Sequence, residues 1–178
     1  MSATPSRGFT YPPSLAPYNI SPAAYLAANP GLKGLVVSAI IIHNSRVLLI
    51  QRAAHDGFPL KWECPGGGVD TTDATILHAV CREVHEETGL VVTRLGEKVN
   101  VLDFDGWENG AKWTKITFLV VLDDGDEAVV RLNAQEHQDA VWATDAEVAS
   151  GMCEGREIVF AYGDQKQLVL DALSANGK

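Results

Sequence analysis

The chain has 178 residues, of which 46% are hydrophobic and 21% charged, and its formal net charge at pH 7 is -9. This length and composition are typical of one globular domain. The negative net charge argues against a DNA or RNA polymer as the main partner. No apolar run approaches the roughly 20 residues of a membrane-spanning helix. No basic start leads into an apolar secretory core, and the three cysteines match neither a zinc site nor a disulfide framework, so a cytoplasmic protein with reduced thiols and no membrane partner is expected.

The first part of the chain is rich in proline. Six of the eight prolines lie in the first 30 residues, so residues 1–33 are predicted to form an irregular extension. Ser21 can cap a short helix inside it, Pro22 suits the first turn, and Pro30-Gly31 would end the helix. We expect this extension, packed or flexible, to carry no chemistry, and the folded body to cover residues 34–178.

The folded body mixes strand and helix patterns. Its first two strands are predicted to pair across a turn at His43-Asn44-Ser45, and the loop at residues 104–112 carries the Asn109-Gly110 turn signal. The predicted strands are residues 34–42, 46–52, 98–103, 113–123, 127–132 and 139–144, and the predicted helices are residues 75–88, 144–150 and 164–173. Strands mixed with helices in this way predict a layered α/β domain.

The helix predicted at residues 75–88 carries a group of acidic side chains. Residues three or four apart are neighbours on a helix, so one side collects Glu83, Glu86 and Glu87. The adjoining stripe is apolar and is expected to face the core: Leu77, Val80, Cys81 and Val84. His78 and His85 fall towards solvent, and Gly89 is placed to end the helix in a left-handed conformation.

Such a group of carboxylates needs a physical reason. Like charges at these spacings cost a few tenths of a kcal/mol each, and the dipole disfavours anions near the end of a helix. A divalent cation against the glutamates would reverse both penalties, because carboxylate oxygens are the ligands that Mg²⁺ prefers. The alternative is a solvated glutamate patch, and the three glutamates alone do not decide between the two.

The loop before this helix favours the cation. It reads WECPGGGVDTTD over residues 62–73, and its glycines allow a close approach of the backbone to a ligand. Thr72 or Asp73 can cap the helix. A glycine triplet alone is more often a turn than a phosphate loop, but this one leads directly into the acidic helix.

The stretch from Gly67/Gly68 to Leu90 resembles the signature of the Nudix hydrolases, Gly-x5-Glu-x7-Arg-Glu-U-x-Glu-Glu-x-Gly-U, where U is aliphatic. The second half of the signature matches at every position: Arg82, Glu83, Val84, Glu86, Glu87, Gly89 and Leu90. The likeness extends from about Leu35 to Trp142. It implies the family fold, a three-layer α/β/α sandwich (α+β) with a mixed β-sheet.

One position of the signature departs from the pattern. Counting back from Arg82 places Ala74 where the first glutamate belongs, whereas counting forward from Gly67 reaches Asp73 with one residue too many before Arg82. The loop can therefore contain one extra residue. In the family this glutamate mainly helps to position the arginine, so the departure leaves open which group orients Arg82.

The resemblance also implies roles for single residues. The metal ligands would be Glu83, Glu86 and Glu87, with a carbonyl of Gly67 or Gly68, and the ion would be Mg²⁺ or Mn²⁺. Arg82 would brace the carboxylates, although a plain helix salt bridge is an alternative. The general base would be Glu83 itself or Glu136, which precedes a predicted strand. Other candidates for the general base lie in the predicted hairpin around residues 104–112: Asp103, Asp105 and Glu108.

Substrate contacts are predicted from residue type. Trp107 in the hairpin loop could stack on a base, and Arg52 or Lys61 could bind phosphate. The other tryptophans are expected in the core or at a subunit contact: Trp62, Trp113 and Trp142. No histidine has a ligand spacing, and none of the five is assigned to a metal.

The resemblance implies a metal-dependent pyrophosphohydrolase that cleaves a nucleoside diphosphate linked to another group, in a small nucleotide derivative. The alternative is a Nudix-fold module that binds a nucleotide without hydrolysing it, and the intact Arg-Glu-x-x-Glu-Glu core favours catalysis. An RNA-cap hydrolase is disfavoured, because no cluster of Lys and Arg would hold a transcript. The sequence leaves open the substrate and whether the protein is a homodimer.

Overall fold

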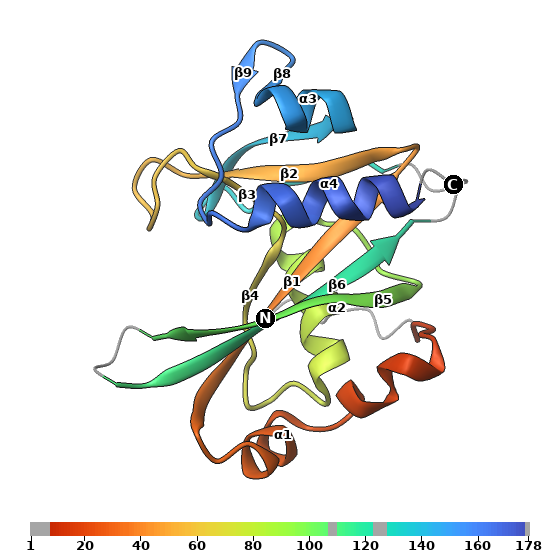
Figure 1. Ribbon diagram of the computed structural model, residues 1–178, viewed down its shortest axis with the longest axis vertical. Helices are drawn as coiled ribbons and strands as arrows, with labels where there is room; N and C mark the ends of the chain where they lie inside the picture. Colours follow the sequence, from red (N-terminus) through yellow and green to blue (C-terminus); the bar gives the residue numbers. More distant parts are fainter. Residues whose placement is uncertain (1–7, 107–109, 123–127, 177–178) are drawn as a thin grey trace.

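The computed structural model describes residues 8–106, 110–122 and 128–176. Its helices are η1 (Pro13–Tyr18), α1 (Pro22–Ala28), α2 (Ile76–Thr88), α3 (Asp145–Ser150) and α4 (Gln165–Asn176). Its strands are β1 (Leu32–His43), β2 (Arg46–Arg52), β3 (Trp62–Glu63), β4 (Gly66–Gly68), β5 (Leu95–Asp105), β6 (Lys112–Val121), β7 (His137–Ala143), β8 (Met152–Cys153) and β9 (Arg156–Glu157) (Figure 1). Within the described residues, no helix is long and apolar enough to cross a membrane.

A mixed sheet organises the molecule around the long strand β1. Its described strands follow the order β3-β2-β1-β6-β5, with β4 paired to β1 and β7 paired to β2. Strands β1 and β6 are parallel, and the other pairs are antiparallel. The predicted pairing of the first two strands is confirmed, with Ile42 opposite Val47. The turn between them places Asn44 and Ser45 at positive φ, as the favoured two-residue hairpin turns require.

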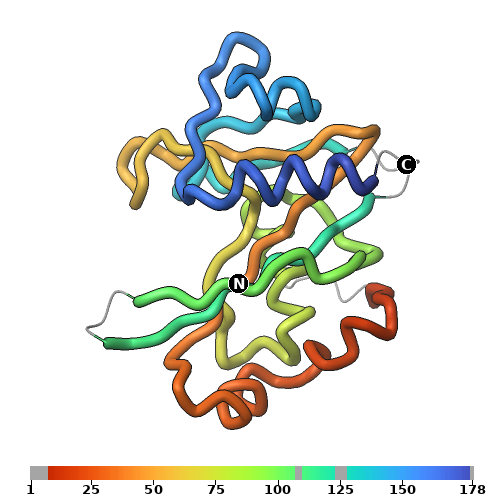
Figure 2. The backbone as a smooth tube through the Cα atoms, viewed as in Figure 1, coloured from red at the N-terminus to blue at the C-terminus, as the bar shows by residue number. Residues whose placement is uncertain are grey.

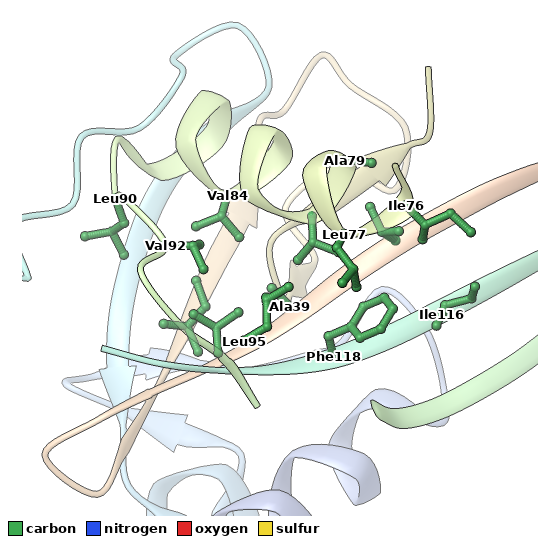
Figure 3. Close-up of a cluster of buried hydrophobic side chains, with 14 of the residues drawn as sticks. Ala39, Ile76, Leu77, Ala79, Val84, Leu90, Val92, Leu95, Ile116 and Phe118 are labelled. Atoms are coloured by element: carbon green, nitrogen blue, oxygen red, sulfur yellow. The ribbon is translucent and has the colours of Figure 1, made fainter. Parts of the chain in front are cut away.

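Helices cover the two faces of this sheet, so the predicted three-layer α/β/α sandwich is confirmed. On one face α2 packs its apolar stripe, including Leu77 and Val84, against Phe118 of β6 (Figure 3). On the other face α4 buries Val169 and Leu173 in a second cluster formed with β1, β2 and β7. This second face is covered only in part, because α4 contacts β1, β2 and β5 whereas the hairpin end of β5 and β6 projects beyond it (Figure 1).

The described part of the N-terminal extension packs on the α2 side of the sheet. The predicted short helix is confirmed as α1, with Ser21 as its N-cap accepting a hydrogen bond from the amide of Ala24. Leu15 of η1 is fully buried in the same cluster as α2. The Ile76 amide, at the start of α2, donates to the carbonyl of Ile20. Figure 2 shows this red and orange segment beside the yellow-green α2.

One predicted strand is wrong. Residues 128–132 form no strand, and residue 127 lies outside the described part of the chain. The Arg131 amide donates to the carbonyl of Thr88, and the Asn133 amide donates to that of Glu87. This segment therefore satisfies the last carbonyls of α2 instead of pairing with a strand.

Candidate active site

Helix α2 fixes the orientation of the acidic side chains. It begins after Thr75, whose hydroxyl accepts a hydrogen bond from the amide of His78, and it ends at Gly89 with φ of +69°. The predicted left-handed end is thus confirmed. The predicted caps Thr72 and Asp73 are wrong, because both precede the N-cap and hydrogen-bond elsewhere.

The three glutamates of α2 lie in different environments. Glu83 and Glu87 are buried, with 8% and 3% of their surface exposed, whereas Glu86 is exposed. Glu87 Oε2 accepts a hydrogen bond of 2.7 Å from the amide of Gly66. A Cβ atom on Gly67 would lie 2.6 Å from Glu83 Oε2, so the two groups are in direct contact. Two of the three predicted ligands are therefore held against the glycine strand β4.

Arg82 holds this arrangement together. Its Nη1 donates to Glu83 Oε1 at 2.7 Å and to Glu86 Oε2 at 3.0 Å. Its Nη2 also donates to the carbonyl of Gly68 at 3.0 Å. The arginine thus links two of the helix glutamates to β4, which is more than a plain helix salt bridge provides.

The structure shows which group orients the arginine. Asp73 accepts two hydrogen bonds from Arg82, at 2.9 Å from Nε and 2.8 Å from Nη2, in a bidentate pair. Hydrogen bonding to Asp73 raises the pKa of Arg82. Ala74, which the signature count places at this position, is exposed. The loop accordingly contains one extra residue, and Asp73 takes the place of the signature's first glutamate.

Two buried residues that the sequence did not point to complete the acidic cluster. His137 Nε2 lies 3.1 Å from Glu63 Oε1 and 3.9 Å from Glu87 Oε1, and all three side chains are buried. Arg52 Nη1 donates to the same Glu63 oxygen at 2.6 Å. A continuous chain of polar contacts therefore runs from Arg52 through Glu63 and His137 to a predicted metal ligand.

Glu136 lies beside this chain. Within the described part of the chain, three residues each offer one possible ligand atom, and these atoms lie within 4.8 Å of one another: Glu87, Glu136 and His137. A single metal ion could bridge this spacing. Glu136 is exposed, and its Oε1 accepts a hydrogen bond from Asn133 Nδ2. Its position next to the helix glutamates agrees with the expectation, and its role as general base stays a prediction.

Burial and mutual repulsion act on the helix carboxylates. Burial raises the pKa of Glu83, although Arg82 opposes that rise. Burial also raises the pKa of Glu87 well above its ordinary value, the Gly66 amide opposes the rise, and Glu83, Glu63 and Glu136 add to it. The cluster thus contains more negative charge than its two arginines neutralise. A divalent cation would remove this penalty, so the residues fit such an ion.

A cavity of about 510 Å³ adjoins the cluster on the sheet face opposite α2. Arg52, Glu63 and β4 line one end of it. Its aromatic lining residues are Phe58, Phe104, Trp113 and Tyr162. The volume lies in the range of roughly 300–1,000 Å³ that is common for small-molecule sites. A ligand in this cavity would reach the glutamates across the glycines of β4.

Only some of the other residues that were predicted to contact the substrate or to act as the base lie at this site. Arg52 lines the cavity, but its guanidinium already donates to Glu63 and Asp56, so phosphate binding by it stays a prediction. Trp107 and Glu108 lie outside the described residues. Asp105 lines the cavity and pairs with Lys112.

The tryptophans divide between the core and the site. Trp62 is buried, as expected, and its ring nitrogen donates to the carbonyl of Glu157. Trp142 packs against the cluster under α2. Trp113 is half-buried and lines the cavity instead of the core.

Comparison with known proteins matches the chain to a family, to a curated relative and to solved structures. The family model described as the NUDIX domain matches residues 32–161. A protein named RNA pyrophosphohydrolase from Rhizobium meliloti (strain 1021) is 37% identical over 59 residues. That stretch covers 33% of this chain and 35% of the relative, so the chain spans about a third of the curated relative it matches.

Solved structures share the fold over most of the chain. The crystal structure of the MutT protein from Methanosarcina mazei Go1 is 26% identical with a TM-score of 0.59, and the match covers 82% of this chain and 95% of that one. The NUDIX domain of Shewanella oneidensis NrtR, complexed with ADP ribose, is 23% identical with a TM-score of 0.61, and the match covers 86% of this chain and 97% of that one. The second likeness shows the fold alone.

Proposed function

The chain belongs to the Nudix family, and from this membership we propose that it is a metal-dependent pyrophosphohydrolase that cleaves a nucleoside diphosphate linked to another group. The observation that carries the proposal is the junction at β4, where Glu83 and Glu87 lie against glycines that also line a ligand-sized cavity. The relative named RNA pyrophosphohydrolase supports an anhydride of phosphate as the bond that is cleaved.

The carboxylates of the site would hold the metal. Glu83, Glu86 and Glu87 present oxygen donors from α2, and Glu136 adds one from the segment before β7. Oxygen donors suit Mg²⁺ or Mn²⁺. When bound, such an ion supplies a Lewis acid that polarises a phosphorus atom and lowers the pKa of a coordinated water.

The protein's own groups would position the reactants and take the proton. A water oxygen bonds to phosphorus, the bond to the bridging oxygen breaks, and a carboxylate oxygen accepts the proton of the water. Glu136 suits this role better than Glu83, because Glu136 is exposed whereas Arg82 already donates to the buried Glu83. Arg82 would hold the helix carboxylates in place beside β4 while negative charge develops on the phosphate.

The shape of the site favours a small substrate. The cavity has about the volume of a nucleotide-sized ligand, and its lining is largely aromatic and aliphatic, which suits a base or a similar group. The net charge of -9 is unfavourable for a long polyanion. A small nucleotide derivative therefore fits better than an RNA or DNA chain.

The proposal is tested by a phosphate-release screen with Mg²⁺ or Mn²⁺ over dinucleoside polyphosphates, ADP-ribose, NADH, nucleotide sugars and oxidised nucleotides. On the best substrate, Glu86→Gln and Glu87→Gln should each lower kcat on the order of 100-fold or more, because each removes a charged metal ligand. Glu157→Gln, which changes an exposed glutamate of β9, is the matched control and should retain full activity.

Two outcomes would contradict the proposal. Full activity in both Glu86→Gln and Glu87→Gln would show that these carboxylates do not serve the reaction. Tight nucleotide binding with no phosphate release from any substrate of the screen would support the alternative, a module that binds a nucleotide without cleaving it.

A further inference from the structure

Glu136 is exposed, yet a specific contact sets the direction of its side chain. Asn133 Nδ2 donates a hydrogen bond of 2.9 Å to Glu136 Oε1. Among the residues that the structure describes, this is the hydrogen bond that the Glu136 carboxylate makes. An exposed glutamate otherwise changes rotamer readily, so the contact with Asn133 decides where the carboxylate points.

The main chain of Asn133 is attached to the end of α2. Its amide donates to the carbonyl of Glu87 at 3.2 Å. Its carbonyl accepts hydrogen bonds from the amides of Glu136 at 3.0 Å and His137 at 2.9 Å. Asn133 therefore joins the helix that carries the predicted metal ligands to the segment that carries Glu136.

A neighbouring amide fixes the orientation of the Asn133 side chain. Asn133 Oδ1 accepts a hydrogen bond of 3.2 Å from the amide of Gln135, as in the turns that asparagine favours. A backbone N–H group can only donate, so the side-chain oxygen must face Gln135. The Asn133 Nδ2 donor must consequently face Glu136.

The main chain of Glu136 is also held from the other side. Its carbonyl accepts a hydrogen bond of 2.8 Å from the amide of Ala53, next to the end of β2. The following residue, His137, is buried, and its Nε2 lies 3.1 Å from Glu63 Oε1. With the main chain fixed at both points, the direction of the Glu136 side chain is the variable that Asn133 controls.

An asparagine amide suits a carboxylate that has to accept a proton. The amide is uncharged, so it orients the carboxylate without forming an ion pair that would compete for its charge. The bond to Asn133 uses Oε1 of Glu136 and leaves Oε2 for the proton.

We propose that Asn133 is a positioning residue for Glu136, which it holds through Oε1 so that Oε2 faces the attacking water. This inference rests on the proposed function, in which Glu136 takes the proton of that water. It adds a residue that touches neither the substrate nor the metal ion and acts through Glu136 alone.

The first test is steady-state kinetics of Asn133→Asp on the best substrate. Aspartate keeps the oxygen that accepts from Gln135 but places a second oxygen, in place of the donor, against Glu136. We expect kcat to fall at least about tenfold while KM changes less than about twofold. The matched control is Asn29→Asp, because Asn29 Nδ2 also donates at 2.9 Å, to the carbonyl of Tyr25 in α1. This control should retain full activity.

A double-mutant cycle separates positioning from a role in the turn alone. Glu136→Gln should lower kcat about 100-fold, the usual effect of losing a general base. In that background Asn133→Asp should have little further effect on kcat, because no base remains to be positioned. A role in the turn alone predicts the same loss in both backgrounds.

A spectroscopic measurement tests the contact without substrate and without Asn133→Asp. In the metal-free protein, the side-chain amide protons of Asn133 should shift upfield in the nuclear magnetic resonance spectrum of Glu136→Gln, because a neutral acceptor replaces a charged one. Glu157→Gln on β9 should leave these signals where they are in the wild-type protein.

Three results would each overturn the inference: full activity in Asn133→Asp, an equal loss of kcat in both backgrounds of the cycle, or Asn133 signals that do not move in Glu136→Gln. The predicted shift together with no hydrolysis of any substrate would contradict the proposed function and leave the contact between Asn133 and Glu136 established.

Discussion

The pair formed by Arg82 and Asp73 keeps a contact of the family signature although the acidic residue stands at a different position in the sequence. The carboxylate of Asp73 forms a bidentate pair with the guanidinium of Arg82, which in turn holds Glu83 and Glu86. A glutamate at residue 74 is not needed for this function, because Ala74 lies on the exposed side of the loop. The extra loop residue therefore shifts the position of the acid in the sequence without removing the contact.

Asp73→Ala should lower kcat by about 10- to 100-fold, the usual effect of losing a residue that orients metal ligands. Steady-state kinetics on the best substrate would measure the loss. Ala74→Glu places a glutamate at the position that the signature gives it. This variant should leave kcat unchanged, because Asp73 already pairs with Arg82. A large gain in Ala74→Glu, or full activity in Asp73→Ala, would show that another group orients Arg82.

The side chains of the site were not equally predictable from the sequence. Glu83 and Glu87 could be placed together because their spacing of four residues fixes their relation on any helix. Glu63 and His137 lie 74 residues apart, and no local pattern links them. Their partial signals were the glycine run that follows Glu63 and the position of His137 directly after Glu136 and at the start of β7.

The contact between α2 and β4 is the structural basis of the site. The side of Gly67 that would carry a Cβ atom faces the Glu83 carboxylate, whereas a Cβ on the neighbouring Gly68 would meet nothing within 4 Å. Neither glycine has a backbone conformation that is closed to other residues. Steric room, and not flexibility, is what Gly67 provides.

These two glycines form a matched pair for mutation. Gly67→Ala should lower kcat on the order of 100-fold, because a Cβ at 2.6 Å from Glu83 Oε2 forces this carboxylate to move away from its place beside β4. Gly68→Ala should retain most of the activity and the same melting temperature. If both variants were equally active, the close packing of β4 on Glu83 would not matter for turnover.

Helices and strands with strong local signals were predicted well. Helix α3 begins after Thr144 with a capping box to Glu147, and the local sequence carries that signal directly. The strand expected at residues 127–132 is wrong over its described residues 128–132, because this segment bonds to the end of α2 and not to a strand. Val129 is 54% exposed, and Arg131 uses its amide at the end of α2. Tertiary context overrode strand propensity there.

The cavity could not be predicted, because it depends on how the layers of the fold meet. Lys115 reads as one more residue of a half-buried strand, and only the incomplete cover by α4 places it in a cavity. The sequence therefore predicted the acidic end of the site and not the cavity beside it.

The buried acidic side chains of the site lower the stability of the whole protein, and the size of this effect depends on pH. Burial raises the folded-state pKa values of Glu83 and Glu87 above the ordinary value of 4.5. A raised carboxylate pKa gives stability that is fully present below the ordinary pKa and is lost as pH rises through the folded pKa. The metal-free protein should thus lose stability from these two groups as the pH rises above about 4.5.

Glu87→Gln tests this cost, because glutamine resembles the protonated acid. In EDTA, the free energy of unfolding of Glu87→Gln relative to wild type should increase by roughly 1–3 kcal/mol between pH 5 and pH 8, the order expected for relief of a buried charge. Urea denaturation at the two pH values measures the difference. A difference that does not change with pH would show that Glu87 is not strained by its burial.

The central claim is that the carboxylates of α2 bind a divalent cation beside the cavity. A titration of the metal-free protein with Mn²⁺, followed by electron paramagnetic resonance, tests it most directly. We predict that wild type and Glu157→Gln bind Mn²⁺ alike and that Glu87→Gln binds it at least about tenfold more weakly. Wild-type affinity in Glu87→Gln, or no binding by the wild-type protein, would contradict the account.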